Sequence, residues 1–420
     1  MIDEWYLFPD LVDTAARPSD HATVQGYMDA LVAPARAQGK DRYFTYITSI
    51  EEENAYISSG TAAGFGIRLS YISSRLRVLE AFESGPALAA GIDRGAQILA
   101  IGKTAGTMRD VADIVASEGT AGLTAALGPA EAGVRRYLRI AASGGGQEST
   151  LAVTKQAFDI DPISDRYGVK VIDEGGTKVG YINLRTFIDT ADGQLRAAFG
   201  DFRSRGIENL IIDLRYNGGG LVRIAELMGD LMGADKSGQV FSRLTVRDSK
   251  AADYNETALF DPPPESIAPM KIAFIGHSGT ASASELVANA MIPYLGSNTA
   301  LVGSNTYGKP VGQFAFDNPD CDDRMRVVVF RTENADGNAD YYNGLASTFP
   351  ITCRASDGIE TKLGDPGEPS IANALAFLVT GNNACTAIST GGQSAQSLSK
   401  PVMLIPAHPS AAQREMPGLF

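Results

Sequence analysis

Residues 209–232 have the sequence NLIIDLRYNGGGLVRIAELMGDLM, an apolar run, a glycine-rich loop and a helical pattern in immediate succession. This pattern predicts a buried strand that ends in the loop and is followed directly by a helix. On either side, strands are expected at residues 178–187 and 271–277, and helices at residues 192–206 and 284–295. Repeated alternation of this kind predicts a layered α/β core.

Outside this pattern the chain divides into segments of different character. Residues 1–58 mix helical stretches with aromatic anchors, which predicts a small N-terminal helical subdomain. Residues 59–143 carry short β-rich runs separated by Gly and Pro, which predict a small β-domain in a protein that is α+β overall. The α/β core is expected at residues 144–390. Residues 391–420 contain several prolines, which predict an extended tail that is disordered by default.

The composition of the 420-residue chain excludes several classes of partner. Its 49 acidic and 36 basic residues give a net charge of −13, and no basic run is present, which argues against nucleic acid and anionic membranes. No apolar segment approaches the roughly 18–20 residues that span a bilayer. The first residues, MIDEWYLFPD, lack a signal-peptide pattern, so either the protein is cytoplasmic or the numbering begins after a removed signal.

Cysteine and histidine are scarce. The three cysteines, Cys321, Cys353 and Cys385, are too far apart for a CxxC site, and with only 3 histidines no metal site is expected. Composition leaves open one disulfide with one free thiol, or three buried thiols.

Three serines lie close together in the stretch GHSGTASASE, residues 276–285. A Gly-x-Ser-x-Gly nucleophile turn around Ser278 fails, because a threonine stands where the last glycine is needed. Ser282 has small neighbours at a predicted helix start, but Ser282 to Glu285 also fits the S-x-x-E capping box. Taken alone, this stretch favours a helix cap. Ser284 is expected to face packing, and His277 is a competing base with no evident partner acid.

Two further features suit acyl chemistry. Lys309 lies in YGKPVGQ among apolar and aromatic residues, and desolvation would lower its pKa from about 10.4 toward roughly 7–8, where the neutral amine is a base. An ordinary lysine with its ammonium in solvent is the alternative. The backbone amides of Gly218 and Gly219 suit an oxyanion, or else the glycines merely permit a tight turn. The loop lacks the Gly-Lys-Ser/Thr and GxGxxG patterns of nucleotide sites.

The motifs NLIIDLRYNGGG, GTASASELVANAM and YGKPVGQ, in that order, resemble those of the C-terminal-processing (tail-specific) serine proteases. The resemblance implies a crotonase/ClpP-like core of ββα units with Ser282 as nucleophile, Lys309 as base and Gln313 orienting the lysine. It also implies an oxyanion hole formed by Ala283 with Gly218 and Gly219. The lysine motif departs from the family pattern at a tyrosine and a proline, and neither removes a reacting group.

The small β-domain resembles a PDZ domain of the bacterial protease-associated type, through SGPALAAGIDRGAQILAIGKT at residues 84–104. The loop of Gly64, Phe65, Gly66 and Ile67 resembles the loop that holds a peptide's terminal carboxylate, where glycine lets the backbone approach an anion. Ala96 departs from the family's usual acidic residue. The chain's own end, PGLF, is apolar beside a free carboxylate, so docking of this tail in a PDZ-like groove is the alternative to disorder.

The resemblance implies a serine endopeptidase that acts through an acyl-enzyme on polypeptides with apolar C-termini, without metal or organic cofactor and without nucleic acid as a partner. A non-catalytic protein that binds hydrophobic ligands or peptides on the same fold is the alternative. Acyl-CoA chemistry on a related fold is not supported, because the sequence has no nucleotide-like site. A homo-oligomer is left open. The resemblance implies a periplasmic or other extracytoplasmic location, which would permit a Cys321–Cys353 disulfide in preference to Cys353–Cys385.

Overall fold

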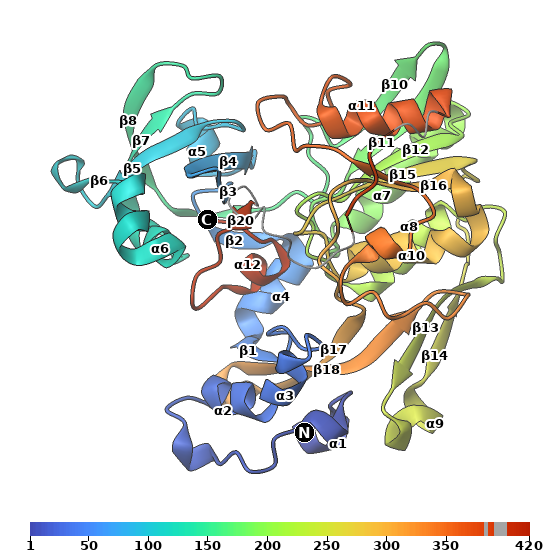
Figure 1. Ribbon diagram of the computed structural model, residues 1–420, viewed down its shortest axis with the longest axis horizontal. Helices are drawn as coiled ribbons and strands as arrows, with labels where there is room; N and C mark the ends of the chain where they lie inside the picture. The colour runs from blue at the N-terminus through green and yellow to red at the C-terminus, as the bar shows by residue number, and fades with distance from the viewer. Residues whose placement is uncertain (382–384, 390–400) are drawn as a thin grey trace.

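The computed structural model describes residues 1–381, 385–389 and 401–420 of the chain. At its centre is a six-stranded sheet in the order β10-β11-β12-β15-β16-β19 (Figure 1). Neighbours from β11 to β19 are parallel, and β10 pairs antiparallel with β11. The strands are β10 (Val169–Glu174), β11 (Thr177–Asn183), β12 (Asn209–Asp213), β15 (Lys271–Gly276), β16 (Thr299–Gly303) and β19 (Thr352–Arg354).

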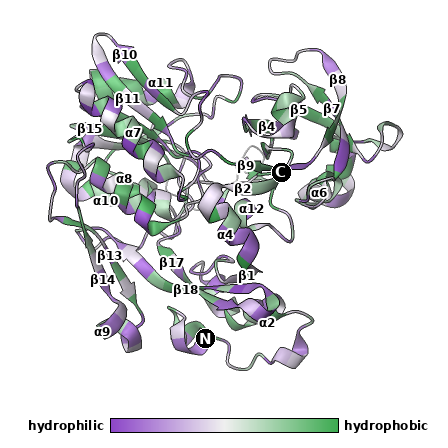
Figure 2. Ribbon diagram, turned by 180° about the vertical axis from the view of Figure 1, so that it is seen from behind, coloured by the Kyte–Doolittle hydropathy of each residue, from purple (hydrophilic) through white to green (hydrophobic). Residues whose placement is uncertain are grey.

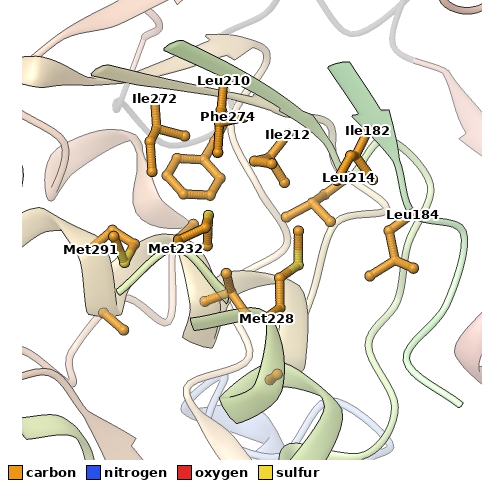
Figure 3. Close-up of a cluster of buried hydrophobic side chains, with 14 of the residues drawn as sticks. Ile182, Leu184, Leu210, Ile212, Leu214, Met228, Met232, Ile272, Phe274 and Met291 are labelled. Carbon is orange, nitrogen blue, oxygen red and sulfur yellow. The ribbon is translucent and has the colours of Figure 1, made fainter. Parts of the chain in front are cut away.

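Helices cover both faces of this sheet and create two hydrophobic cores. The helices are α7 (Ala191–Ser204), α8 (Val222–Leu231) and α10 (Ala283–Leu295) on one face, and α11 (Pro369–Leu375) on the other. Because successive strand residues point to opposite faces, Leu210 and Ile212 enter the first core and Ile211 the second. Figure 3 shows the first core, in which strand side chains meet Met228 and Met291.

The predicted mixed α/β architecture is confirmed. The apolar run that begins at Asn209 is β12, and the helical pattern after the glycine loop is α8. Figure 2 shows the hydrophobic colour concentrated on the central strands and on α8 and α10. Among the described residues, no helix has both the length and the apolar character that a membrane crossing needs.

The small β-domain is a second, seven-stranded sheet with its own core. Its strands are β3 (Ile67–Ile72), β4 (Arg75–Ala81), β5 (Gln97–Gly102), β6 (Arg109–Asp110), β7 (Arg135–Ala141), β8 (Glu148–Thr154) and β20 (Val402–Met403). The helices are α5 (Pro86–Ala89) and α6 (Val111–Leu127). A two-stranded ribbon of β2 (Thr61–Gly64) and β9 (Gln156–Asp159) lies at the base of this domain.

A third sheet joins the N-terminal part of the chain to strands of its second half and was not predicted. It contains β1 (Tyr46–Ser49), β13 (Val240–Val246), β14 (Glu256–Leu259), β17 (Val311–Asn318) and β18 (Asp323–Glu333). The N-terminal helices pack against this sheet, and they are α1 (Ile2–Trp5), α2 (Val24–Leu31) and α3 (Ala33–Ala37). The N-terminal helices therefore share their core with strands from the second half of the chain.

Residues 401–420, which we call the C-terminal segment, are ordered against the rest of the protein. They contribute β20 as an edge strand on β3, and α12 (Ala411–Glu415), which packs against α4 (Ile50–Ser59). The default expectation of a disordered tail is therefore wrong for these residues. Buried apolar side chains hold the segment, among them Leu404, Met416 and Phe420.

The expected Cys321–Cys353 disulfide is wrong. Cys353, in β19 of the central sheet, is bonded to Cys385, whereas Cys321 is a free, exposed thiol in the turn between β17 and β18. The two loops are similar in length, so loop-closure entropy could not distinguish them. Cys321 lies in a turn of the third sheet and Cys353 in the central sheet, and this separation decides the pairing.

Replacing Cys385 by serine is expected to lower the free energy of unfolding by about 3–4 kcal/mol, because the bond closes a loop over a sequence separation of 32 residues. Urea unfolding of the oxidised proteins measures this difference. Cys321→Ser is the matched control and should unfold like the parent. Equal midpoints for both variants would contradict the assignment.

Candidate active site

Ser282 occupies the N-cap position of α10, directly after the loop that follows β15. Its backbone has φ 56° and ψ −118°, a positive-φ conformation that is rare for a residue with a side chain. The side chain is only half-buried, although its neighbours Ala281 and Ala283 are buried. The serine is thus held in a strained turn at a helix N-terminus with its hydroxyl group at the surface of a cavity.

Glu285 links this serine turn to the segment that carries the lysine. Its buried carboxylate accepts hydrogen bonds from the N–H of Ser282 at 3.2 Å and from the N–H of Gly308 and Lys309 at 2.7 Å each. The Thr306 hydroxyl donates to it at 2.6 Å. Burial raises the pKa of Glu285, and these hydrogen bonds oppose the rise. The sequence indicated Glu285 only as a capping-box residue.

Lys309 is 8% exposed and is oriented by Gln313. Lys309 Nζ donates to Gln313 Oε1 at 3.0 Å, and Gln313 Nε2 donates to the Phe44 carbonyl at 2.6 Å. The ammonium also lies 5.0 Å from the centroid of the Phe44 ring. Desolvation lowers the pKa of Lys309, and the carboxylates of Glu415 and Asp41 oppose this effect.

The glycine loop after β12 abuts the serine. A Cβ on Gly219 would meet Ser282 Cβ at 2.8 Å, so a larger residue does not fit there. The Gly219 N–H donates to Asn217 Oδ1 at 2.9 Å, whereas the Gly218 N–H donates to the Glu415 carbonyl at 3.0 Å. Ala283 is the first residue of α10, so its N–H has no acceptor within the helix.

Two cavities share lining residues at this place. One, of about 170 Å³, is lined by Ser282 and Gln313, and the other, of about 430 Å³, by Gly218 and Lys309. Glu415 lines both. The fold therefore brings together the serine, the lysine, the glutamine and the glycine loop that the sequence singled out.

The competing serines and the histidine lie in other environments. Ser284 is buried and its hydroxyl donates to the Asn217 carbonyl at 3.0 Å, as expected of a packing residue. Ser278 is exposed and pairs with His277 Nδ1 at 3.1 Å. Burial lowers the pKa of His277, whose ring packs 5.8 Å from that of Tyr216.

The loop Gly64–Ile67 holds the chain's own terminus. The Ile67 N–H donates to a Phe420 oxygen at 3.2 Å, and the Phe420 N–H donates to the Ile67 carbonyl at 2.9 Å. A Cβ on Gly64 would lie 2.6 Å from the Phe420 carboxyl carbon, so this approach requires glycine. The docking that the sequence left as an alternative is what the structure contains, and Figure 1 shows the C-terminus beside β20 and β2.

Comparison with known proteins finds similarity to one group of peptidases. Residues 178–349 match the model of peptidase family S41. A chloroplastic C-terminal processing peptidase of Tetradesmus obliquus is 28% identical over 280 residues, covering 62% of this chain and 54% of that protein. A carboxyl-terminal-processing protease of Picosynechococcus is 28% identical over 273 residues, covering 63% and 58%. The chain thus spans a little over half the length of these relatives.

Solved structures support the fold. A putative S41 protease from Bacteroides fragilis has a TM-score of 0.69 at 22% identity, over 91% of this chain and 96% of that one. The photosystem II D1 C-terminal processing protease has a TM-score of 0.50 at 20% identity, over 88% and 96%.

Proposed function

From the resemblance to the C-terminal-processing serine proteases, which the similarity to family S41 supports, we propose that this chain is a serine endopeptidase that cleaves polypeptides near their C-termini. The observation that carries the proposal is the arrangement around Glu285. One buried carboxylate fixes both the strained turn of Ser282 and the backbone of Lys309. A helix cap alone would not explain why this carboxylate also holds a dehydrated lysine.

In the proposed reaction, the neutral amine of Lys309 takes the proton of the Ser282 hydroxyl as Oγ attacks the substrate carbonyl. The N–H groups of Gly218 and Ala283 stabilise the oxyanion. The lysine then gives the proton to the leaving amine, and water hydrolyses the acyl-enzyme. Gly219 shapes the loop, since its own N–H is bonded to Asn217. No metal or organic cofactor takes part in these steps.

We further assign the core to the crotonase/ClpP-like type and the small β-domain to the PDZ type. The support for the second assignment is that the edge of β3 pairs with the chain's own extended C-terminus by strand addition, with the carboxylate at the glycine loop. An extracytoplasmic, oxidising location is proposed on the Cys353–Cys385 disulfide.

Ser282→Ala is expected to abolish cleavage of an internally quenched peptide with an apolar C-terminus, because it removes the nucleophile. The matched control is Ser278→Ala, an exposed serine of the same loop, which should retain activity within about twofold of the parent, as surface changes usually do. Covalent labelling of Ser282 by a fluorophosphonate, located by peptide mapping, gives an independent readout. A parent protein that neither cleaves nor is labelled, yet binds the peptide, would be a non-catalytic peptide-binding protein instead.

A further inference from the structure

The C-terminal segment follows one edge of the small β-domain twice. Val402 and Met403 pair antiparallel with Tyr71 and Ser70 of β3. The chain then leaves the sheet, forms α12, and returns so that the Leu69 N–H donates to the Gly418 carbonyl at 2.7 Å. The same strand edge that would receive a substrate tail is thereby occupied along its length.

The last side chain fills a pocket suited to an aromatic ring. Phe420 is buried in the core of the small β-domain together with Phe65. Lys155 Nζ lies 4.8 Å from the Phe65 ring centroid and 5.9 Å from that of Phe420, a cation–π arrangement. Lys155 is held in place by the carbonyls of Gly128 and Pro129, to which Nζ donates at 2.8 and 2.7 Å. The small β-domain therefore positions this lysine through its own backbone and not through Phe420.

Five residues upstream, the segment reaches the proposed catalytic centre. The Glu415 carbonyl accepts the Gly218 N–H at 3.0 Å, which takes one of the two proposed oxyanion donors. Its half-buried side chain lines the same cavity as Lys309, where the negative charge favours the ammonium form of the lysine. An ammonium cannot accept the serine proton. Both contacts therefore oppose catalysis.

The segment is held as a blocker rather than as a peptide ready for cleavage. The N–H of Met416 would be the leaving nitrogen if the Glu415 carbonyl were attacked, but it donates to the Ala412 carbonyl at 2.9 Å within α12. This helix is capped at Ser410, which accepts the Gln413 N–H, and Gln413 Nε2 donates to the Leu419 carbonyl at 2.8 Å. Attack would require this whole structure to unwind.

We propose that the C-terminal segment is an intramolecular inhibitor of this chain, displaced by polypeptides whose own C-termini end in an aromatic residue and a free carboxylate. That the segment inhibits catalysis rests on the proposed function, whereas its competition with other C-termini for β3 does not. A covalently linked ligand acts at an effective concentration that reaches millimolar, so only a competing terminus that pairs with β3 and fills the Phe420 pocket opens the site.

The test measures binding in Ser282→Ala protein, so that no catalysis is required. A fluorescent peptide ending in Gly-Leu-Phe with a free carboxylate is titrated against the full chain and against a chain that ends at Glu415. The truncated chain is expected to bind at least about tenfold more tightly, because the linked competitor is gone. A C-terminally amidated peptide should bind neither protein well.

A second variant keeps the full length. Gly418 has φ +86° and its Cβ would lie 2.6 Å from the Leu69 carbonyl oxygen, so Gly418→Ala should dislodge the segment and match the truncation. Ile405→Ala, at an exposed position of the same segment, is the control and should bind like the parent. Equal affinities for the full, truncated and Gly418→Ala chains would overturn the proposal.

The last measurements use the protein with Ser282 intact and follow its activity and its mass. A chain that ends at Arg414 is expected to raise kcat/KM for short peptides as well as tailed ones by at least about tenfold, because this truncation also removes Glu415 from the proposed catalytic centre. Intact-mass measurement follows the parent over time. Loss of Met416–Phe420 from the parent but not from Ser282→Ala would show that the segment is a substrate in cis, and would overturn lasting inhibition.

Discussion

Lys309→Ala is expected to reduce kcat/KM for peptide hydrolysis by about 10²–10⁴-fold while the protein remains folded. The backbone N–H of Lys309 is tied to the serine turn through Glu285, and Gln313 orients the amine of its side chain. His277→Ala is the control and should change kcat/KM far less, because the histidine pairs with Ser278 instead. A Lys309→Ala enzyme that keeps more than a tenth of the parent activity would rule out this lysine as the base.

The pH profile identifies the lysine independently. Burial lowers the pKa of Lys309 below its ordinary 10.5. Because only the neutral amine is a base, kcat/KM should increase with pH as the ammonium loses its proton, and this increase should occur at a pH below 10.5. The charged groups that face it are Asp41, Glu285, Arg326 and Glu415. Ending the chain before Glu415 removes the carboxylate that most favours the ammonium, so the acid limb of the profile should move to lower pH. A limb that moves upward would contradict this assignment.

The local sequence pattern was sufficient to predict the strands and helices of the α/β core, but it did not predict the third sheet. β12 and α8 are contiguous, so their apolar run and helical period were visible together. The third sheet pairs Tyr46 with Arg326 and Val246 with Phe330, and such partners are set by the tertiary fold rather than by neighbouring residues. Prolines favoured a disordered tail, yet the buried Leu404 and Phe420 outweigh that preference.

The candidate site divides in the same way. Short motifs identified the candidate residues Ser282, Lys309 and Gln313, because each motif also determines the conformation of its own loop. The cross-link through Glu285 was not visible, since the S-x-x-E spacing explains that residue equally well as a cap. The binding of the Gly218 N–H by Glu415 joins positions that are distant in sequence, and only the folded chain brings them together.

A buried charge cluster below the glycine loop was likewise hidden in the sequence. Arg215 follows β12 directly and is 1% exposed. Its guanidinium contacts Asp213 at 2.8 Å, Glu368 at 2.9 Å and Asp357 at 3.3 Å. These carboxylates keep the pKa of Arg215 well above its ordinary value despite burial. Arg94 of the small β-domain also binds Asp357, at 2.9 Å, so the cluster joins the loop to both domains.

Arg215→Met is expected to lower the free energy of unfolding by about 3–5 kcal/mol, because it leaves buried carboxylates without their cation. Urea unfolding measures the loss, and Arg205→Met is the matched control. Arg205 pairs with Asp201 on α7, but its side chain is 54% exposed, so that change should stay within about 0.5 kcal/mol.

The pH dependence of this loss separates charge from packing. Arg94 and Arg215 hold the pKa of Asp357 well below its ordinary value. The ionised carboxylate therefore stabilises the fold at pH values above the pKa that Asp357 has in the unfolded chain, and this stabilisation is lost as pH falls through the pKa of the folded state. The deficit of Arg215→Met should therefore shrink below about pH 4, where the carboxyl groups of the variant are protonated. A deficit that does not shrink below about pH 4 would mean that the arginine contributes through packing alone, and that the loop carrying Gly218 is not held by charge.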